Sequence, residues 1–175
     1  MTKPRLFTWL GASATEADFE QLYQVELPRI YNFFRYRLGD GPLAEDLTSE
    51  TFEKAWRNRD RYRRDLAAFS TWLFTIAQRV AVDHLRKQRP VVSLDDVVQF
   101  SSEENIEALA QKRADFKRLS IVLARLADRD RELVALKYGA GLTNRTIAGL
   151  TGLTESNVGV LLHRALQSLR AEWEA

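Results

Sequence analysis

The sequence predicts an all-α protein of two small helical domains joined by a flexible acidic linker. Apolar residues recur at helical spacing, and no segment shows the sustained apolar–polar alternation that indicates a strand. Residues 91–110 contain acidic residues but no Lys or Arg, and they follow Pro90, which disfavours continuation of the preceding helix. We therefore assign residues 1–90 to an N-terminal helical domain, 91–110 to the linker and 111–175 to a C-terminal helical domain.

Three helices are expected in the N-terminal domain. Pro28 either occupies the first turn of a new helix or kinks one long helix. Ser70 or Thr71 is expected to open the third helix. The expected helices cover residues 17–38, 43–58 and 69–89. Core packing is the simpler explanation for the aromatic residues at helical spacing, which are Phe33, Phe34, Phe52, Trp56, Phe69 and Trp72.

The C-terminal domain carries a helix-turn-helix pattern at residues 142–158. Thr143 is expected to cap its first helix, and Gly152 can take the positive φ that ends this helix. Thr154 then caps a second helix with apolar residues at helical spacing. Because this motif projects an exposed helix into the DNA major groove, the pattern predicts DNA binding. Two helices precede it, at residues 107–127 and 129–138.

Composition excludes several classes of site. The chain has no Cys, which rules out disulfides and thiolate zinc sites, and its two His residues are far apart in sequence, so we expect no metal and no cofactor. No apolar run approaches the ~20 residues that a membrane span needs, so membrane insertion is not expected. The net charge of +2 says little about nucleic acid, whereas the distribution of charge is informative.

A basic and aromatic stretch lies between the second and third predicted helices, at residues 57–64. Tyr62 stands among five arginines there, and the third helix ends in a second basic cluster. Arginines interleaved with aromatic rings suit single-stranded nucleic acid, because cations contact phosphates while rings stack on exposed bases. The alternative is a solvated charged loop.

Several sequence blocks resemble one known family. The blocks at residues 44–56, 69–77 and 81–86 are similar to the helical promoter-melting domain of bacterial RNA polymerase sigma factors, of the short extracytoplasmic-function type. The C-terminal resemblance begins at residue 126 and continues across the helix-turn-helix to residue 165. The resemblance as a whole covers nearly everything except the first dozen residues and the acidic linker.

The resemblance implies that the second helix docks on a coiled coil of the largest subunit of core RNA polymerase. The alternative is an ordinary solvated helix face. The matching positions are Asp46, Leu47, Ser49, Glu50 and Glu53.

The resemblance also implies that residues 57–68 capture a flipped base of the melted promoter strand, and that the end of the third helix contacts phosphate of the adjacent duplex. Gln78 and Arg79 depart from the Arg-Asn that the family often carries, so the base preference near the melting point is expected to differ. The expected contacts to this element are Arg57, Arg59, Arg61, Tyr62, Arg63, Arg64, Trp72, Arg79, His84, Arg86, Lys87 and Arg89.

The last helix is expected to read the upstream promoter element. It departs from the family at Gly159, Val160 and Leu161, where relatives often carry cationic residues. Val160 either meets a thymine methyl group or packs within the domain. The expected contact residues are Thr154, Glu155, Ser156, Asn157, Gly159, Val160, His163 and Arg164.

These patterns predict a cytoplasmic sigma factor that binds core RNA polymerase and promoter DNA and performs no chemistry itself. The family further implies a partner anti-sigma protein, and a linker that either mimics nucleic acid in a polymerase channel or serves as a plain spacer. One alternative is a two-domain helix-turn-helix regulator whose residues 1–90 sense a ligand in an apolar pocket. An enzyme is disfavoured, because the chain offers no catalytic constellation.

Overall fold

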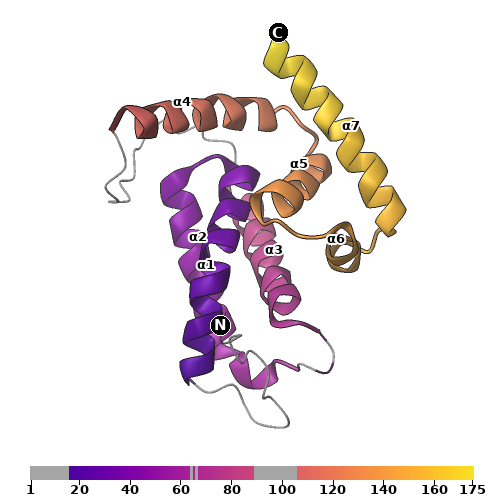
Figure 1. Cartoon of the computed structure of the whole chain (residues 1–175). Helices are drawn as coiled ribbons and strands as arrows, with labels where there is room; N and C mark the ends of the chain where they lie inside the picture. The colour runs from indigo at the N-terminus through magenta and orange to yellow at the C-terminus, as the bar shows by residue number, and fades with distance from the viewer. Residues whose placement is uncertain (1–15, 64, 66, 89–105) are drawn as a thin grey trace, which may run out of the picture.

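The computed structural model describes residues 16–63, 65, 67–88 and 106–175. These residues form helices and no strand, which confirms the all-α prediction (Figure 1). Arg64, Arg89 and residues 91–105 of the expected linker lie outside the described residues. The helices are α1 (Glu16–Leu38), α2 (Gly41–Arg57), α3 (Phe69–Lys87), α4 (Ile106–Leu123), α5 (Asp128–Val134), α6 (Asn144–Thr151) and α7 (Glu155–Glu174), with a 3-10 turn η1 (Arg59–Arg61) and a π-helical turn η2 (Ala135–Gly139).

Helices α1, α2 and α3, which we call the N-terminal module, pack around an aromatic core. Phe33 and Phe74 are fully buried and meet edge to face, with ring centroids 5.9 Å apart. Pro28 lies inside one continuous α1, which resolves the two alternatives left open by the sequence. Such ring pairs bury large apolar areas, which a domain of this size needs for stability.

The start of α3 differs from the prediction. Its N-cap is Ala68, and no side chain caps it, so neither Ser70 nor Thr71 opens the helix. The Ser70 hydroxyl instead lies 3.3 Å from Nη1 of Arg29, from which it accepts a hydrogen bond. The cap of α2 is regular, since the carboxylate of Asp40 accepts the Leu43 N–H at 2.9 Å.

Helices α4 to α7, the C-terminal module, contain the predicted helix-turn-helix. The hydroxyls of Thr143 and Thr154 accept backbone N–H groups at 3.1 Å, which confirms both predicted caps. Gly152 has a φ of +74° and ends α6, as predicted. Helix α4 begins at Ile106, so residues 106–110 of the expected linker are helical.

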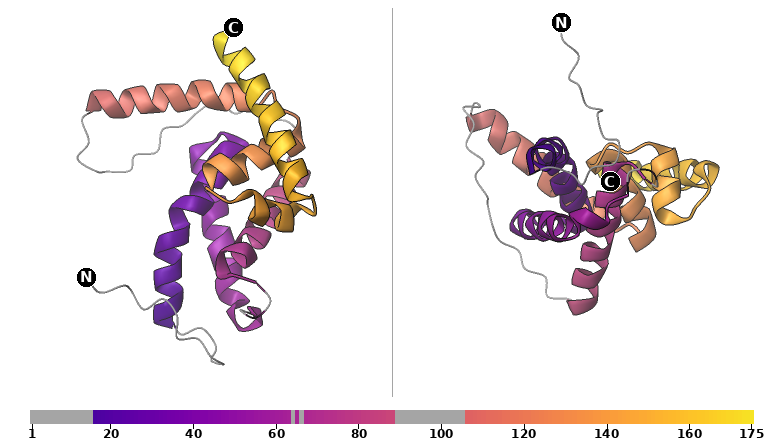
Figure 2. Two further views of the ribbon diagram at one scale, coloured as in Figure 1. Left: turned by 45° about the vertical axis from the view of Figure 1, so that its right-hand side comes forward. Right: turned by 90° about the horizontal axis from the view of Figure 1, so that it is seen from below.

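The two modules pack against each other. Helices α5, α6 and α7 lie along one side of α1–α3, and α4 crosses near one end of α1 and α2 (Figures 1 and 2). Buried residues of both modules form one continuous hydrophobic cluster. This packing was not predicted from the sequence.

None of the helices in the described ranges is long and apolar enough to cross a membrane.

Candidate nucleic-acid and partner interfaces

The exposed side of α2 carries most of the residues expected to meet a protein partner. The side chains of Asp46, Ser49 and Glu53 are exposed, and that of Glu50 is half-buried. Leu47 is only 5% exposed and belongs to the core, so the expectation that it contacts a partner directly is wrong for this conformation. It falls on the buried side of the helix, where its role is to hold α2 against its neighbours.

Two of the acidic side chains on α2 already form ion pairs within the helix. Glu50 lies 2.7 Å from Nζ of Lys54, and Glu53 lies 2.5 Å from Nη2 of Arg57, both at i,i+4 spacing. Such surface pairs contribute little to stability and exchange readily. The carboxylates therefore remain available to cationic groups of a partner at small cost.

An aromatic cluster forms at the start of α3. The ring of Tyr62 lies 5.2 Å from that of Trp72 and 5.6 Å from that of Phe69, measured between centroids. The Tyr62 hydroxyl donates to the backbone oxygen of Ala67 at 3.1 Å, which closes the intervening loop. Phe69 is buried, whereas Tyr62 and Trp72 are half-buried. Both rings thus support the core and keep surface open to a ligand.

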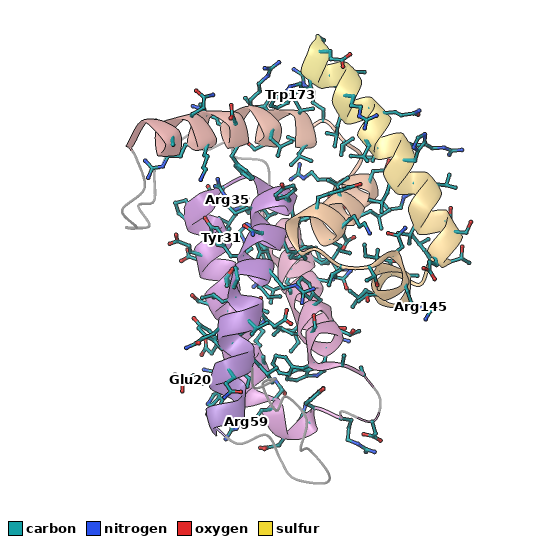
Figure 3. The ribbon with its side chains drawn as sticks, viewed as in Figure 1. Glu20, Tyr31, Arg35, Arg59, Arg145 and Trp173 are labelled. Carbon is teal, nitrogen blue, oxygen red and sulfur yellow. The ribbon has the colours of Figure 1, made fainter. Side chains whose placement is uncertain are left out.

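The arginines next to this cluster differ in how firmly they are held. The guanidinium of Arg59 stacks 4.1 Å above the ring centroid of Trp56 and donates to its backbone oxygen at 2.9 Å. Arg63 forms two hydrogen bonds to Asp65, at 2.9 and 2.8 Å, and these lower the pKa of the Asp65 carboxyl. Arg61 is exposed. Figure 3 places Arg59 at the end of the N-terminal module that lies away from α4.

The C-terminal half of α3 presents the second basic cluster. Arg79, Arg86 and Lys87 are exposed. His84 is half-buried, and its Nε2 atom is buried with no hydrogen-bond partner in the described part of the chain. A phosphate contact through Nε2 therefore requires rotation of this side chain, whereas the other three residues can reach phosphate as they stand.

Helix α7 exposes the side expected to read DNA. Glu155, Ser156, Asn157, His163 and Arg164 are exposed at the capped beginning and middle of the helix. The opposite side is buried in the C-terminal module through Val158, Leu161, Leu162 and Ala165.

The other three residues expected to contact DNA at α7 are Thr154, Gly159 and Val160, and each has a distinct structural setting. Thr154 is the N-cap, so its hydroxyl orients the helix. Val160 is 46% exposed, which is compatible with a methyl contact and excludes the packed alternative. Gly159 is half-buried, and a Cβ atom there would lie 3.7 Å from Nδ2 of Asn144.

Arg145 was not among the residues expected from the sequence. It is on α6, points outward (Figure 3), and its Nε lies 3.7 Å from a carboxylate oxygen of Glu155. Its position in the sequence could have identified it as a candidate DNA contact. It lies two residues after the cap Thr143, at the exposed beginning of the helix that precedes α7.

In the described part of the chain, His, Asp and Glu side chains form no group that could hold a metal ion. A cavity of about 290 Å³ lies between α3 and the helices α5 and α6. Most of its lining residues belong to the C-terminal module, among them Arg129, Leu133 and Leu153. It is therefore not the apolar pocket within residues 1–90 that a ligand-sensing domain would require.

Comparison with known proteins matches both modules to described domains. Residues 22–91 match Sigma-70 region 2, and residues 118–169 match Sigma-70, region 4. The chain is 32% identical to RNA polymerase sigma factor CarQ of Myxococcus xanthus, over 87% of both chains. It is 29% identical to ECF RNA polymerase sigma factor SigM of Bacillus subtilis, over 87% of this chain and 93% of that one.

A third relative is longer than this chain. The identity to ECF RNA polymerase sigma factor BldN of Streptomyces coelicolor is 30%, over 90% of this chain but only 61% of the relative.

Two solved structures share the fold. One is the sigma factor RpoE bound to the anti-sigma factor NepR from Bartonella quintana, with a TM-score of 0.71, 21% identity and coverage of 90% of this chain and 98% of that one. The other is CnrH bound to the cytosolic domain of CnrY, with a TM-score of 0.64, 24% identity and coverage of 91% and 89%.

Proposed function

This chain belongs to the extracytoplasmic-function (ECF) family of bacterial RNA polymerase sigma factors, and we propose on that premise how its surfaces divide the work of initiation. Helix α2 docks on core RNA polymerase, the surface around η1 and α3 opens the downstream promoter element, and α7 reads the upstream element. A sigma factor performs no chemical step itself, and family membership disfavours the two-domain regulator that the sequence left as an alternative.

The observation that carries this division is the presence of separate exposed surfaces of different chemistry on one chain. The α2 surface of Asp46, Ser49, Glu50 and Glu53 is acidic and suits a basic partner helix. The surface of η1 and α3 combines arginines with aromatic rings. The beginning of α7 is polar and exposed, as a major-groove reader requires.

Strand opening is assigned to the aromatic cluster and its arginines. Tyr62 and Trp72 offer partly open ring surfaces that lie 5.2 Å apart, next to exposed Arg61. A base flipped from the duplex loses stacking worth a few kcal/mol, and contact with aromatic rings recovers part of it. Arg86 and Lys87 then hold the adjacent duplex by phosphate contacts, which position the protein without reading sequence.

Reading of the upstream element is assigned to the first turns of α7. Glu155 suits a cytosine amino group, Asn157 suits adenine, and Val160 suits a thymine methyl group. Arg145 and Arg164 are exposed cations and suit phosphate. Arg145 also lies within ion-pair distance of the Glu155 carboxylate, with Nε 3.7 Å from the nearer oxygen.

The remaining assignments follow from the same function. Residues 1–90 and 106–175 act as the two promoter-binding domains, and residues 91–105 span the polymerase between them as an acidic mimic of nucleic acid. A cytoplasmic location follows from the location of polymerase and promoter. A separate anti-sigma protein is the expected inhibitor, since both structural neighbours described above were solved with such a partner or with a cytosolic domain of another protein.

Charge reversal on α2 tests the polymerase assignment. Asp46→Arg together with Glu50→Arg should abolish association with core RNA polymerase, while circular dichroism stays native-like because both side chains lie outside the core. The matched control reverses the same number of charges at Glu20 and Glu174, which are also exposed. Unchanged association of the α2 variant would refute the assignment.

A further inference from the structure

We propose that Asn144 of α6 is a further specificity-determining residue, and that its carboxamide reads an adenine through the gap that Gly159 leaves on α7. Asn144 lies outside α7 and was not among the residues expected from the sequence to contact DNA. This inference rests on the proposed function, because it adds a base contact to the helix-turn-helix that is assigned to the upstream element.

Gly159 interrupts a row of side chains on the reading side of α7. Glu155, Gly159 and His163 follow one another at steps of four residues, so they lie along one side of the helix. The side chains of Glu155 and His163 are exposed, whereas Gly159 is half-buried although it has no side chain of its own. Another residue must therefore occupy part of the surface between them.

Asn144 is the residue that lies over Gly159. A Cβ atom on Gly159 would be 3.7 Å from Nδ2 of Asn144. In the described part of the chain the Cβ would meet nothing else within 4 Å, apart from its chain neighbours and the backbone of its own helix. The carboxamide of Asn144 thus stands where a side chain at position 159 would project.

Packing does not require a glycine at position 159. A separation of 3.7 Å is an ordinary van der Waals contact, so a methyl group would fit there. Gly159 also does not adopt the positive φ that favours glycine. Because glycine destabilises a helix interior relative to alanine, its presence indicates a role other than packing. A longer side chain would cover the Asn144 amide, and glycine leaves this amide open.

The capped start of α6 fixes the position of Asn144. The hydroxyl of Thr143 accepts the Thr146 N–H at 3.1 Å and lies 2.9 Å from the Thr146 hydroxyl. Arg145 follows directly, points outward, and has its Nε 3.7 Å from the carboxylate of Glu155 (Figure 3). Asn144 therefore enters the reading surface from a fixed position beside the first turns of α7.

The Asn144 carboxamide has an unsatisfied acceptor. Its Oδ1 is buried, and no donor in the described part of the chain bonds to it. An unpaired buried acceptor costs free energy, which a ligand that supplies a donor would recover. The terminal torsion of asparagine is broad, so the carboxamide can turn to present Oδ1 and Nδ2 together.

This chemistry selects adenine over phosphate and over the other bases. Phosphate oxygens and the guanine edge in the major groove offer acceptors only, so neither can satisfy Oδ1. Adenine presents its N6 amino group beside the N7 acceptor, so Oδ1 accepts from the first while Nδ2 donates to the second. Cytosine would supply only the single donor at N4. A bidentate contact to adenine is therefore the match that uses both amide atoms.

Selection on a randomised upstream element tests the proposal with the holoenzyme, formed from core polymerase and the full chain. The starting promoter is one that this holoenzyme uses on host genomic DNA. We expect the parent to select adenine at one position that depends on Asn144. Asn144→Ala should lower the preference for adenine at that position about fivefold or more and leave the other positions unchanged.

Two further variants separate base reading from a merely structural role. Asn144→Asp keeps the shape of the side chain but only accepts hydrogen bonds, so the preference at the same position should move from adenine to cytosine. Arg145→Ala, at the next residue of α6, removes a phosphate contact and should weaken binding evenly while the selected sequence stays the same.

Gly159→Lys tests the gap itself. The long side chain should cover the Asn144 amide, so the preference for adenine is lost at the same position. Asn144→Ala added to Gly159→Lys should then change this position no further. If Asn144→Ala still removed a preference for adenine in the Gly159→Lys background, the gap would not be what exposes the amide, and the proposal would be wrong.

The selected sequences also distinguish failure of this inference from failure of the proposed function. A parent holoenzyme that uses no promoter overturns the proposed function, and the role of Asn144 falls with it. A parent that selects a defined upstream element, which Asn144→Ala and Asn144→Asp both retain or bind evenly more weakly, overturns the role of Asn144 alone. Circular dichroism of each variant identifies a misfolded protein, and the Asn144→Asp result decides if Asn144→Ala does not fold.

Discussion

Arg29 places Nη1 3.0 Å from each carboxylate oxygen of Glu26, and the Glu26 residue is only 5% exposed. Burial raises the pKa of the Glu26 carboxyl, because desolvation outweighs the attraction of Arg29 and the hydrogen bond from Ser70. The buried carboxylate orients Arg29, whose Nε reaches Ala140 in the other module. A charged group in the core of the N-terminal module thus supports the contact between modules.

The raised pKa of Glu26 predicts a specific pH dependence of stability. A carboxyl whose pKa in the fold exceeds its ordinary value of 4.5 binds a proton more tightly when folded. The stability that this carboxyl contributes to the fold is fully present below pH 4.5 and is lost as the pH rises through the pKa of the folded state. The free energy of unfolding of the parent, relative to Glu26→Gln, should therefore fall with rising pH across this window and then level off.

Urea unfolding of both proteins at a series of pH values measures this difference. A difference that is constant with pH, or that grows as the pH rises through the window, would contradict the pKa direction.

The N-cap of α7, the helix expected to read DNA, predicts that removal of a single hydroxyl lowers the stability of the fold. Thr154→Ala removes the acceptor of the Asn157 N–H and should lower the free energy of unfolding by about 1 kcal/mol. Ser156→Ala removes an exposed hydroxyl on the same turn that caps nothing and serves as the control. Equal urea midpoints for the two variants would show that the cap contributes nothing measurable.

Phosphate contact by Arg86 predicts a change in salt dependence. Arg86→Gln should weaken promoter binding by holoenzyme for all promoter sequences and reduce the slope of log affinity against log salt by about one unit. Arg113→Gln, at an exposed position on α4, controls for net charge. Binding of holoenzyme to two promoters, measured at several salt concentrations, tests this prediction. A loss of affinity for one promoter alone would indicate that Arg86 reads bases instead of contacting phosphate.

Local features of the fold were predictable from the sequence, whereas long-range contacts were not. The caps at Thr143 and Thr154 and the left-handed Gly152 depend on neighbouring residues only, so their patterns were sufficient. Ser70 looked like a helix cap but is engaged with Arg29, forty-one positions earlier. Its neighbour in space was not visible in the sequence.

The candidate interfaces show the same division. The helical periodicity of the sequence placed Asp46 and Glu50 on the exposed side of α2. Leu47 was expected to contact the partner as well, although it falls on the apolar side of the same helix and is buried. The pairing of Arg37 with Asp128 joins two modules across the acidic segment. Each residue alone looks like an ordinary surface charge, so only the three-dimensional arrangement identifies the contact.

The central claim is that this chain directs initiation by core RNA polymerase, and reconstituted transcription tests it most directly. Purified protein is added to sigma-free core enzyme from the same host, with templates drawn from that host's genome. The account predicts transcripts with defined start sites that depend on the added protein and disappear with the Asp46→Arg, Glu50→Arg variant. Absence of any dependent transcript across the genomic templates, with core enzyme that responds to another sigma factor, would contradict it.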